Sequence, residues 1–495
     1  MSFSSHYSIL LVAVPLAFAA LCPIVGMWKR ELCFPFSVAG AAAACFFIFS
    51  LWGKVISKGV VSYTPGGWKP PLGIQIRIDY VGLFMASIIG AVGLAVLVYS
   101  WRYVSRELDA EKIPYYYTLY MLLFASMLGF VVTGDIFNMF VFMEIFSISS
   151  YALVAITGQR RAVRAAFKYL LMGATSSVMV LLGIAFLYST VGSLNMEDIA
   201  GRLAMGGYTS VASIALVLFL IGFAVKAALF PVHIWLPDAH SIAPSPISAV
   251  LSALVIKMGV LGILRIFFTV YTPGFAGIEG TWTALLQAIA WCAAISIVLA
   301  SIMAIIQRDF KVMIAYSSIA HIGYILLGIC MLTDKGLTGG LYNILAHALG
   351  KGCFFLVAGI IIYKHDLRRI TSLRGLGRSM PVTAGAFAVA SLSIVGLPPS
   401  AGFIAKWYIL WGCLQKQHYV FMVMVLLGSL LSAIYCFRVV YYMFFVGSHS
   451  AEIDEGPATM IVPAASFAAA TLFFGIFATL VLPSLSSAAQ ALLAG

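Results

Sequence analysis

The sequence predicts an all-α polytopic membrane protein with about fourteen transmembrane helices, arranged as two inverted five-helix repeats that each contain a broken helix. Of its 495 residues, 62% are hydrophobic and only 9% are charged, and the mean hydropathy is +1.05. A soluble domain carries roughly 25% charged residues, whereas in a bilayer lipid replaces water around most side chains. The hydrophobic residues also fall into runs of about 20, the length that a helix needs to span a membrane.

Fourteen apolar runs can be placed along the chain. The first is not preceded by Lys or Arg, as a signal peptide would be, and Lys29 and Arg30 follow it directly. We therefore interpret it as a retained helix whose N-terminus lies outside. The predicted spans are 8–28, 34–53, 78–99, 115–133, 136–157, 165–190, 210–230, 244–270, 282–305, 311–332, 337–363, 381–411, 419–445 and 459–484.

The basic residues predict the orientation of these spans. The net charge is +12, and most of the Lys and Arg residues lie in the odd-numbered loops, among them Arg160, Arg161 and Arg374. Such an excess marks cytoplasmic loops. We therefore expect a protein of the plasma (inner) membrane with both termini on the outer side. Because the charges are spread over short loops in lipid-bound protein, nucleic acid is not an expected partner.

Prolines predict that two of the spans are interrupted. The seventh ends near Lys226 and then meets Pro231, while the twelfth contains Pro398 and Pro399 ahead of Lys406. Proline lacks an amide donor and clashes with the preceding turn, so the helix unwinds locally. Unwound backbone at membrane depth is tolerated only where it lines protein or a watery cavity.

Charged positions recur at intervals of about 180 residues, which predicts an internal repeat. Five spans fill each interval, and because that number is odd the second copy should be inverted. The recurring pairs are Lys226 with Lys406, Lys257 with Arg438, and Lys168 with Lys351. The expected division is 1–110 for the first three spans, 111–270 and 271–445 for the two repeats, and 446–495 for the last span.

Ionisable residues inside the predicted spans are candidates for an ion path. A charge at a helix centre costs roughly 2.5–3.5 kcal/mol. For any single residue, an ion pair or hydrogen bond that locks helices together explains the cost equally well. For the set, one buried glutamate cannot neutralise every lysine, and desolvation favours the neutral form of a surplus lysine, which can then relay protons. The candidates are Glu144, Lys226, Lys257, His321, His347, Lys351 and Lys406.

Other polar residues have simpler interpretations. Asp79 begins the third span and is expected at the membrane interface. His233 and His240 flank the seventh break, where they either line an entrance or cap exposed backbone. Arg438 lies inside the thirteenth span and either snorkels to the cytoplasmic side or joins the relay. The eight cysteines form no Cys-x-x-Cys pair, so no metal or iron–sulfur framework is expected.

Four sequence motifs, in this order along the chain, resemble those of a known family. They read GDIFNMFVFMEIFSISSY at 134–151, KAALFPVHIWLPDAH at 226–240, APSPISAVLSALVIK at 243–257 and IAYSSIAHIGY at 314–324. They resemble the antiporter-like subunits shared by respiratory complex I, Mrp-type sodium/proton antiporters and membrane-bound group-4 hydrogenases. The resemblance extends from about residue 80 to 445, and around Glu144 it is nearest to the D-type subunits of Mrp antiporters and to the hydrogenases.

The resemblance implies a fourteen-helix fold with inverted repeats and a polar axis along the membrane midplane. Members of the family carry Lys or Glu at the position of Lys406, and many have Gln at the position of His321. The implied roles are a switch pair for Glu144 and Lys226, the central relay for Lys257, the far end for Lys406, and a bridge between the halves for His321 and His347.

We therefore expect a proton- or sodium/proton-translocating subunit of a larger membrane complex. The chain has no flavin, nucleotide or iron–sulfur motif, so no cofactor is expected in it, and any electron transfer belongs to partner membrane subunits of a multisubunit antiporter or of an NADH-quinone or hydrogenase-type oxidoreductase. One alternative is a stand-alone secondary antiporter, which would transport ions without partners. Another is a haem or quinone subunit with His321 and His347 as ligands, which an absorbance spectrum would reveal.

Overall fold

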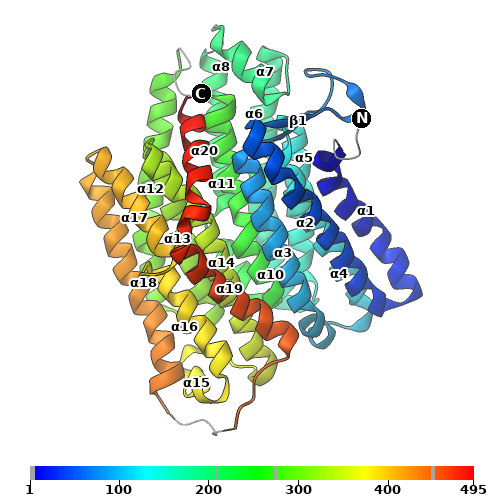
Figure 1. Ribbon diagram of the computed structural model, residues 1–495, viewed down its shortest axis with the longest axis vertical. Coiled ribbons are helices and arrows are strands. Elements are labelled where there is room, and N and C mark those ends of the chain that lie inside the picture. The colour runs from blue at the N-terminus through cyan, green and yellow to red at the C-terminus, as the bar shows by residue number, and fades with distance from the viewer. Residues whose placement is uncertain (1–5, 207–208, 273–276, 448–451, 495) are drawn as a thin grey trace.

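The protein is described here by a computed structural model that covers residues 6–206, 209–272, 277–447 and 452–494 (Figure 1). Thirteen helices in these ranges are long and apolar enough to cross a membrane. The remaining one, the twelfth predicted span, is present as two shorter helices separated by a break, α16 (Pro381–Val395) and α17 (Ala401–Gln415). The prediction of an all-α polytopic membrane protein with about fourteen spans is confirmed.

The first three spans pack beside a small hairpin that the sequence pattern did not predict. The hairpin consists of β1 (Val61–Tyr63) and β2 (Ile76–Ile78), which pair antiparallel with Val61 opposite Ile78. Each strand has only three residues, too few for an alternating pattern to stand out. The spans are α1 (Tyr7–Trp28), α2 (Cys33–Lys58) and α3 (Tyr80–Glu107).

The next group contains the first broken helix and a short helix, α7, that was also not predicted. The eighth predicted span is one continuous rod, in which two π-helical turns, η5 and η6, interrupt the α-helical pattern. The elements are α4 (Ile113–Val132), α5 (Ile136–Ala155), α6 (Arg160–Val191), α7 (Met196–Ala204), α8 (Thr209–Ala227), α9 (Leu236–Ile242), α10 (Ser245–Val250), η5 (Leu251–Val255), α11 (Ile256–Arg265) and η6 (Ile266–Val270).

The remaining helices complete the bundle. The last predicted span bends after α19 and continues as α20. Besides α16 and α17, this part contains α12 (Glu279–Ile306), α13 (Phe310–Cys330), α14 (Asp334–His365), α15 (Leu376–Ser379), α18 (Tyr419–Phe445), α19 (Ala458–Ile476) and α20 (Leu482–Ala494).

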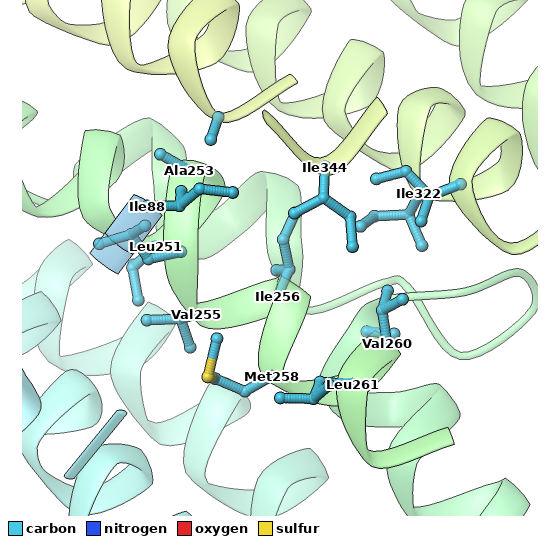
Figure 2. Packing of buried hydrophobic residues seen from close by; sticks show 14 of the residues in the cluster. Ile88, Leu251, Ala253, Val255, Ile256, Met258, Val260, Leu261, Ile322 and Ile344 are labelled. Atoms are coloured by element: carbon cyan, nitrogen blue, oxygen red, sulfur yellow. The ribbon is translucent and has the colours of Figure 1, made fainter. Parts of the chain in front are cut away.

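The core of the bundle lies around α14 and the rod Ser245–Val270. The apolar stretch of each is entirely buried, whereas only a third of the corresponding stretch in α1 or α19 is buried. Figure 2 shows apolar side chains of the rod, such as Ile256, packed towards Ile344 of α14 and Ile322 of α13. A charged group on these central helices is therefore surrounded by protein and not by solvent.

The two ends of the bundle differ. Figure 1 places α15 at the lower end and both marked termini at the upper end. We call the end around α15 the basic end: Arg378 lies in α15, Arg374 stands two residues before that helix, and the Arg308 carbonyl oxygen accepts a hydrogen bond from the Ile370 amide of the segment before α15. Termini on one side agree with an even number of spans.

Candidate functional site

Glu144 lies on α5 at the flank of the bundle. Ser177 of α6 donates a hydrogen bond to its Oε1 atom. The sequence predicted that the Glu144 carboxylate is buried. In the isolated chain this prediction is wrong, because Glu144 is only half-buried. Val141 and Ile148 lie one helical turn away on the same face of α5, and both are exposed. The carboxylate therefore stands at the edge of the protein.

Lys226 lies at the end of α8 and is buried. Its Nζ atom donates to the Ser147 hydroxyl at 2.7 Å and to the Tyr151 hydroxyl at 3.3 Å. Both acceptors belong to α5, as does Glu144, with which Lys226 interacts electrostatically. Within the described ranges no ion pair joins Glu144 to Lys226, so each partner of the predicted switch is held by a hydroxyl group.

The predicted break after Lys226 is present. Helix α8 ends at Ala227, and Ala228 takes a left-handed conformation with φ 55°. The Trp235 indole donates to the carbonyl oxygen of Val225 at 3.0 Å, and the Phe230 amide donates to the Ser296 hydroxyl at 3.1 Å. Side chains thus satisfy backbone groups that the break frees, as a segment at membrane depth requires.

Lys257 is at the centre of the molecule and is 1% exposed. It follows the π-helical turn η5, and its Nζ atom donates to the carbonyl oxygen of Ser252 within that turn. Such π-turns in α-helices are frequent at functional sites. The Ser252 hydroxyl in turn lies 2.8 Å from the Ser318 hydroxyl of α13, which links the rod to its neighbour.

Close helix packing brings Lys257 towards Lys226. Gly259 of α11 lies against the end of α8, so that a Cβ atom at this position would come within 2.7 Å of the Lys226 carbonyl carbon. Only glycine allows this approach. Sequence reasoning missed Gly259, which stands two residues after Lys257, the last residue of the motif at 243–257.

His321 of α13 and His347 of α14 stack with ring centroids 5.1 Å apart and an angle of 17° between the rings. Both are buried, and none of their ring nitrogens has a hydrogen-bond partner among the described residues. Lys351 lies one turn further along α14, is fully buried, and donates to the Ser317 hydroxyl. The structure thus brings these three predicted residues together.

Lys406 occupies the second break. Its Nζ atom donates to the carbonyl oxygens of Ile394 at 3.0 Å and Val395 at 2.9 Å, the last residues of α16, and to the Ser429 hydroxyl at 3.1 Å. It also lies 4.4 Å from the centroid of the Tyr324 ring. The lysine therefore satisfies carbonyl groups left free where α16 ends.

Electrostatic interactions connect the inner residues. Lys351 interacts electrostatically with Lys257 and with Lys406. His321 interacts electrostatically with all three of these lysines. Among the described residues none of these lysines forms an ion pair with a carboxylate. The candidates thus fall into a flank group, Glu144 and Lys226, and an inner group that runs from Lys257 to Lys406.

Two charged residues from the repeat argument lie elsewhere. Arg438 donates to the carbonyl oxygens of Ile305 and Gln307, the latter at 2.7 Å, and so caps the end of α12 instead of contacting the inner group. The Lys168 side chain is 42% exposed and pairs with Asp238 at 2.6 Å, an environment unlike that of buried Lys351. Equal spacing therefore does not give equal surroundings at these positions.

Sequence reasoning missed a buried arginine at the end of the bundle opposite the basic end. Arg265 of α11 binds Asp79 through both of its terminal nitrogens, and Arg77 also contacts Asp79, at 2.9 Å. Burial by itself would raise the pKa of the Asp79 carboxyl, but the guanidinium groups of Arg265 and Arg77 hold it well below its usual range. Asp79 is thus a structural partner as well as the cap of α3.

Comparison with known proteins identifies a family and several relatives that this chain resembles. Residues 133–432 match the protein family described as NADH:quinone oxidoreductase/Mrp antiporter, TM. The chain is 36% identical over 493 residues to the N-type subunit of the NADH-quinone oxidoreductase of Desulforudis audaxviator (strain MP104C), covering 96% of each chain. It is 29% identical to the D-type subunit of the Na(+)/H(+) antiporter of Bacillus subtilis (strain 168), covering 99% of this chain and 97% of that one.

A solved structure is similar over nearly the whole length. A chain of the membrane-bound sulfane sulfur reductase, an archaeal respiratory membrane complex, superimposes with a TM-score of 0.91 at 30% identity, covering 98% of this chain and 97% of that one. All four motifs quoted above lie inside the matched family region. The predicted resemblance is confirmed.

Proposed function

The chain belongs to the NADH:quinone oxidoreductase/Mrp antiporter transmembrane family, as an antiporter-like membrane subunit, and on that premise we propose that it moves protons, or sodium ions in exchange for protons, through the residues from Glu144 to Lys406. One observation carries the proposal. Lys257, Lys351 and Lys406 are buried and bonded only to hydroxyl or carbonyl oxygens. A buried charge without a counter-charge is costly, so each lysine can exist neutral as well as charged.

In this proposal the flank group is the switch. The Ser147 and Tyr151 hydroxyls hold the Lys226 ammonium, while Ser177 holds the Glu144 carboxylate. Closing the pair favours the charged lysine, and opening it favours release of a proton. Because Lys226 is bonded to the same helix that carries Glu144, a side-chain rotation is enough to change their separation.

The inner group is the relay. His321 interacts electrostatically with Lys257, Lys351 and Lys406, and His347 interacts with Lys257, Lys351 and His321. A neutral imidazole can accept a proton on one nitrogen and release one from the other. Their stacked arrangement argues against the haem alternative. An iron atom held between two imidazoles needs a nitrogen of each ring directed at it, whereas these rings face each other.

The finer assignments belong to the same proposal. We assign residues 111–270 and 271–445 to two inverted repeats, and the basic end to the cytoplasmic side of the plasma membrane. Partner membrane subunits supply the driving reaction, as the names of the relatives suggest: an NADH-quinone oxidoreductase and a sodium/proton antiporter. The exposed flank beside Glu144 is a surface that such a partner can cover.

The test is Lys226→Ala in the intact membrane complex, reconstituted into sealed vesicles with pH- and sodium-sensitive dyes. We expect the coupled ion movement to be abolished while the subunit still inserts and assembles. Lys416→Ala is the matched control, because Lys416 is exposed in the turn between α17 and α18. Undiminished transport by the Lys226 variant at normal abundance would remove the flank group from the mechanism.

A further inference from the structure

We infer that Lys311 and His240 carry protons between the basic end and the middle of the relay. The inference rests on the proposed function, and it adds two residues to the candidate set. Of these, the sequence singled out only His240, which was expected either to line an entrance or to cap exposed backbone at the seventh break. Both are buried, and both lie between the surface of the basic end and Lys351.

Lys311 is the outer of the two groups. It stands in the first turn of α13, which begins at the basic end, and it is 3% exposed. Its Nζ atom donates to the carbonyl oxygen of Ala243 at 2.5 Å, and no described carboxylate forms an ion pair with it. Burial, the nearby Arg368 and the N-terminus of α13 disfavour its ammonium form, whereas Asp309 and Glu107 favour it, so without an ion pair the lysine is not fixed in one protonation state.

The groups around Lys311 lead outwards to the surface. Its electrostatic neighbours are Arg368, Asp309 and Glu107, and Glu107 is exposed at the end of α3. Tyr103, one turn earlier on α3, is buried, and its hydroxyl receives a hydrogen bond from Ser245 at 3.3 Å. An exposed carboxylate and a buried hydroxyl thus flank the approach to Lys311.

His240 is the inner group. It is 0% exposed, and neither of its ring nitrogens has a hydrogen-bond partner among the described residues. Its electrostatic neighbours are Lys311 on one side and Lys257 and Lys351 on the other. The ring stacks on Phe355 at 4.9 Å between centroids, and Phe355 lies one turn from Lys351 on α14. Buried polar atoms are normally paired, so two unpaired nitrogens at this position call for a functional explanation.

The proton transfers balance along this route. A proton from the aqueous medium reaches the neutral amine of Lys311, which becomes an ammonium group. The imidazole of His240 accepts that proton on one nitrogen and gives up another from its second nitrogen to the neutral amine of Lys351. Rotation of the flexible lysine side chains brings each donor to its acceptor.

The competing explanation is structural. Lys311 would stabilise the turn between α9 and α10 through its hydrogen bond to Ala243, and His240 would only pack against Phe355. Lys311→Arg separates the two explanations, because arginine keeps the charge and the donor for Ala243 but does not release a proton at working pH. We expect transport by the intact complex in sealed vesicles to fall about tenfold or more. Lys416→Arg at the exposed turn is the matched control and should leave the rate unchanged.

His240→Phe provides an independent variant, because it keeps an aromatic ring on Phe355 and removes the proton carrier. We expect a similar loss at normal assembly, with partial recovery when the medium at the basic end is acidified, since a higher proton concentration speeds a slowed uptake step. A folding defect would not recover in this way. His418→Phe, at an exposed histidine, is the control.

The outcomes separate this inference from the proposed function. Normal transport by Lys311→Arg and His240→Phe, together with loss in Lys226→Ala, would overturn the uptake route and leave the relay in place. Normal transport by Lys226→Ala as well would overturn the proposed function first. If either Lys311→Arg or His240→Phe does not assemble, transport by the other variant tests the uptake route.

Discussion

Ser147, Ser317 and Ser429 each accept a hydrogen bond from a candidate lysine. A hydroxyl group can accept from an ammonium group and can also donate to a neutral amine. A carboxylate in the same place would hold the lysine in its charged form. At the scale of single residues, the chain therefore surrounds its lysines with partners that suit both protonation states.

Lys257→Arg tests whether the central lysine must release its proton. Arginine conserves the charge but stays protonated at working pH, so we expect impaired turnover in the intact complex although the variant assembles normally. Proton movement in sealed vesicles is the measurement. If arginine works as well as lysine, Lys257 is an electrostatic anchor and carries no proton.

Glu144→Gln tests the charge of the switch. Glutamine keeps the shape of the side chain and can still accept the hydrogen bond from Ser177, but it does not attract Lys226 electrostatically. We expect coupled transport to be lost, with the same abundance in the membrane. Ser177→Ala is the companion variant: it removes the hydrogen bond and keeps the charge, and it should have the smaller effect. The reverse order would contradict the switch.

At the scale of elements, we predict that the break between α16 and α17 is required for fast ion transport. Pro398 and Pro399 have no amide hydrogen, so the carbonyl groups four residues earlier, Ile394 and Val395, accept from Lys406 instead. Replacing both prolines with alanine supplies the missing donors and should join the two helices. We expect slower ion transport in that double variant.

The measurement is transport alongside a structure of residues 390–410. Pro463→Ala is the control, because Pro463 lies inside α19. A continuous helix with undiminished transport would show that the break serves packing only.

Arg265 and Asp79 join the central rod to the start of α3, and their loss should destabilise the bundle. Breaking a buried pair by removing one partner costs roughly 3–5 kcal/mol, so Asp79→Asn should lower the thermal stability of the purified protein. Because the folded-state pKa of Asp79 is depressed, its contribution is present above the unfolded pKa of about 3.9 and is lost as the pH falls below it. A variant with wild-type stability at neutral pH would contradict this role.

The spans and both breaks could be predicted because hydrophobic length and proline act locally. The burial of Lys226, Lys257, Lys351 and Lys406 could be predicted because each stands in an apolar run, where a charge is rare. By contrast, the half-exposure of Glu144 and the close approach at Gly259 depend on which helices pack together. Arg265 was missed because it stands near a predicted span end, where an arginine normally reaches water.

At the scale of the whole molecule, the surface beside Glu144 is apolar, and no other part of the described chain covers it. Ile148 of α5 and Phe167 and Val178 of α6 are exposed on the helices that carry Glu144 and Ser177. Such residues face either lipid or another membrane protein. A carboxylate at this depth is costly in contact with lipid, so a protein neighbour over this flank would stabilise the charged form that the switch requires.

The last prediction follows from that incomplete flank. The chain purified alone and reconstituted into vesicles should insert normally but transport ions at most at about a tenth of the rate of the intact complex, because Glu144 then faces lipid and its charge is disfavoured. The measurement is proton and sodium flux per inserted subunit, with Lys226→Ala as the zero-transport control in both preparations. Equal flux with and without partners, abolished by Lys226→Ala in both, would identify a stand-alone antiporter and would show that the flank beside Glu144 needs no protein neighbour.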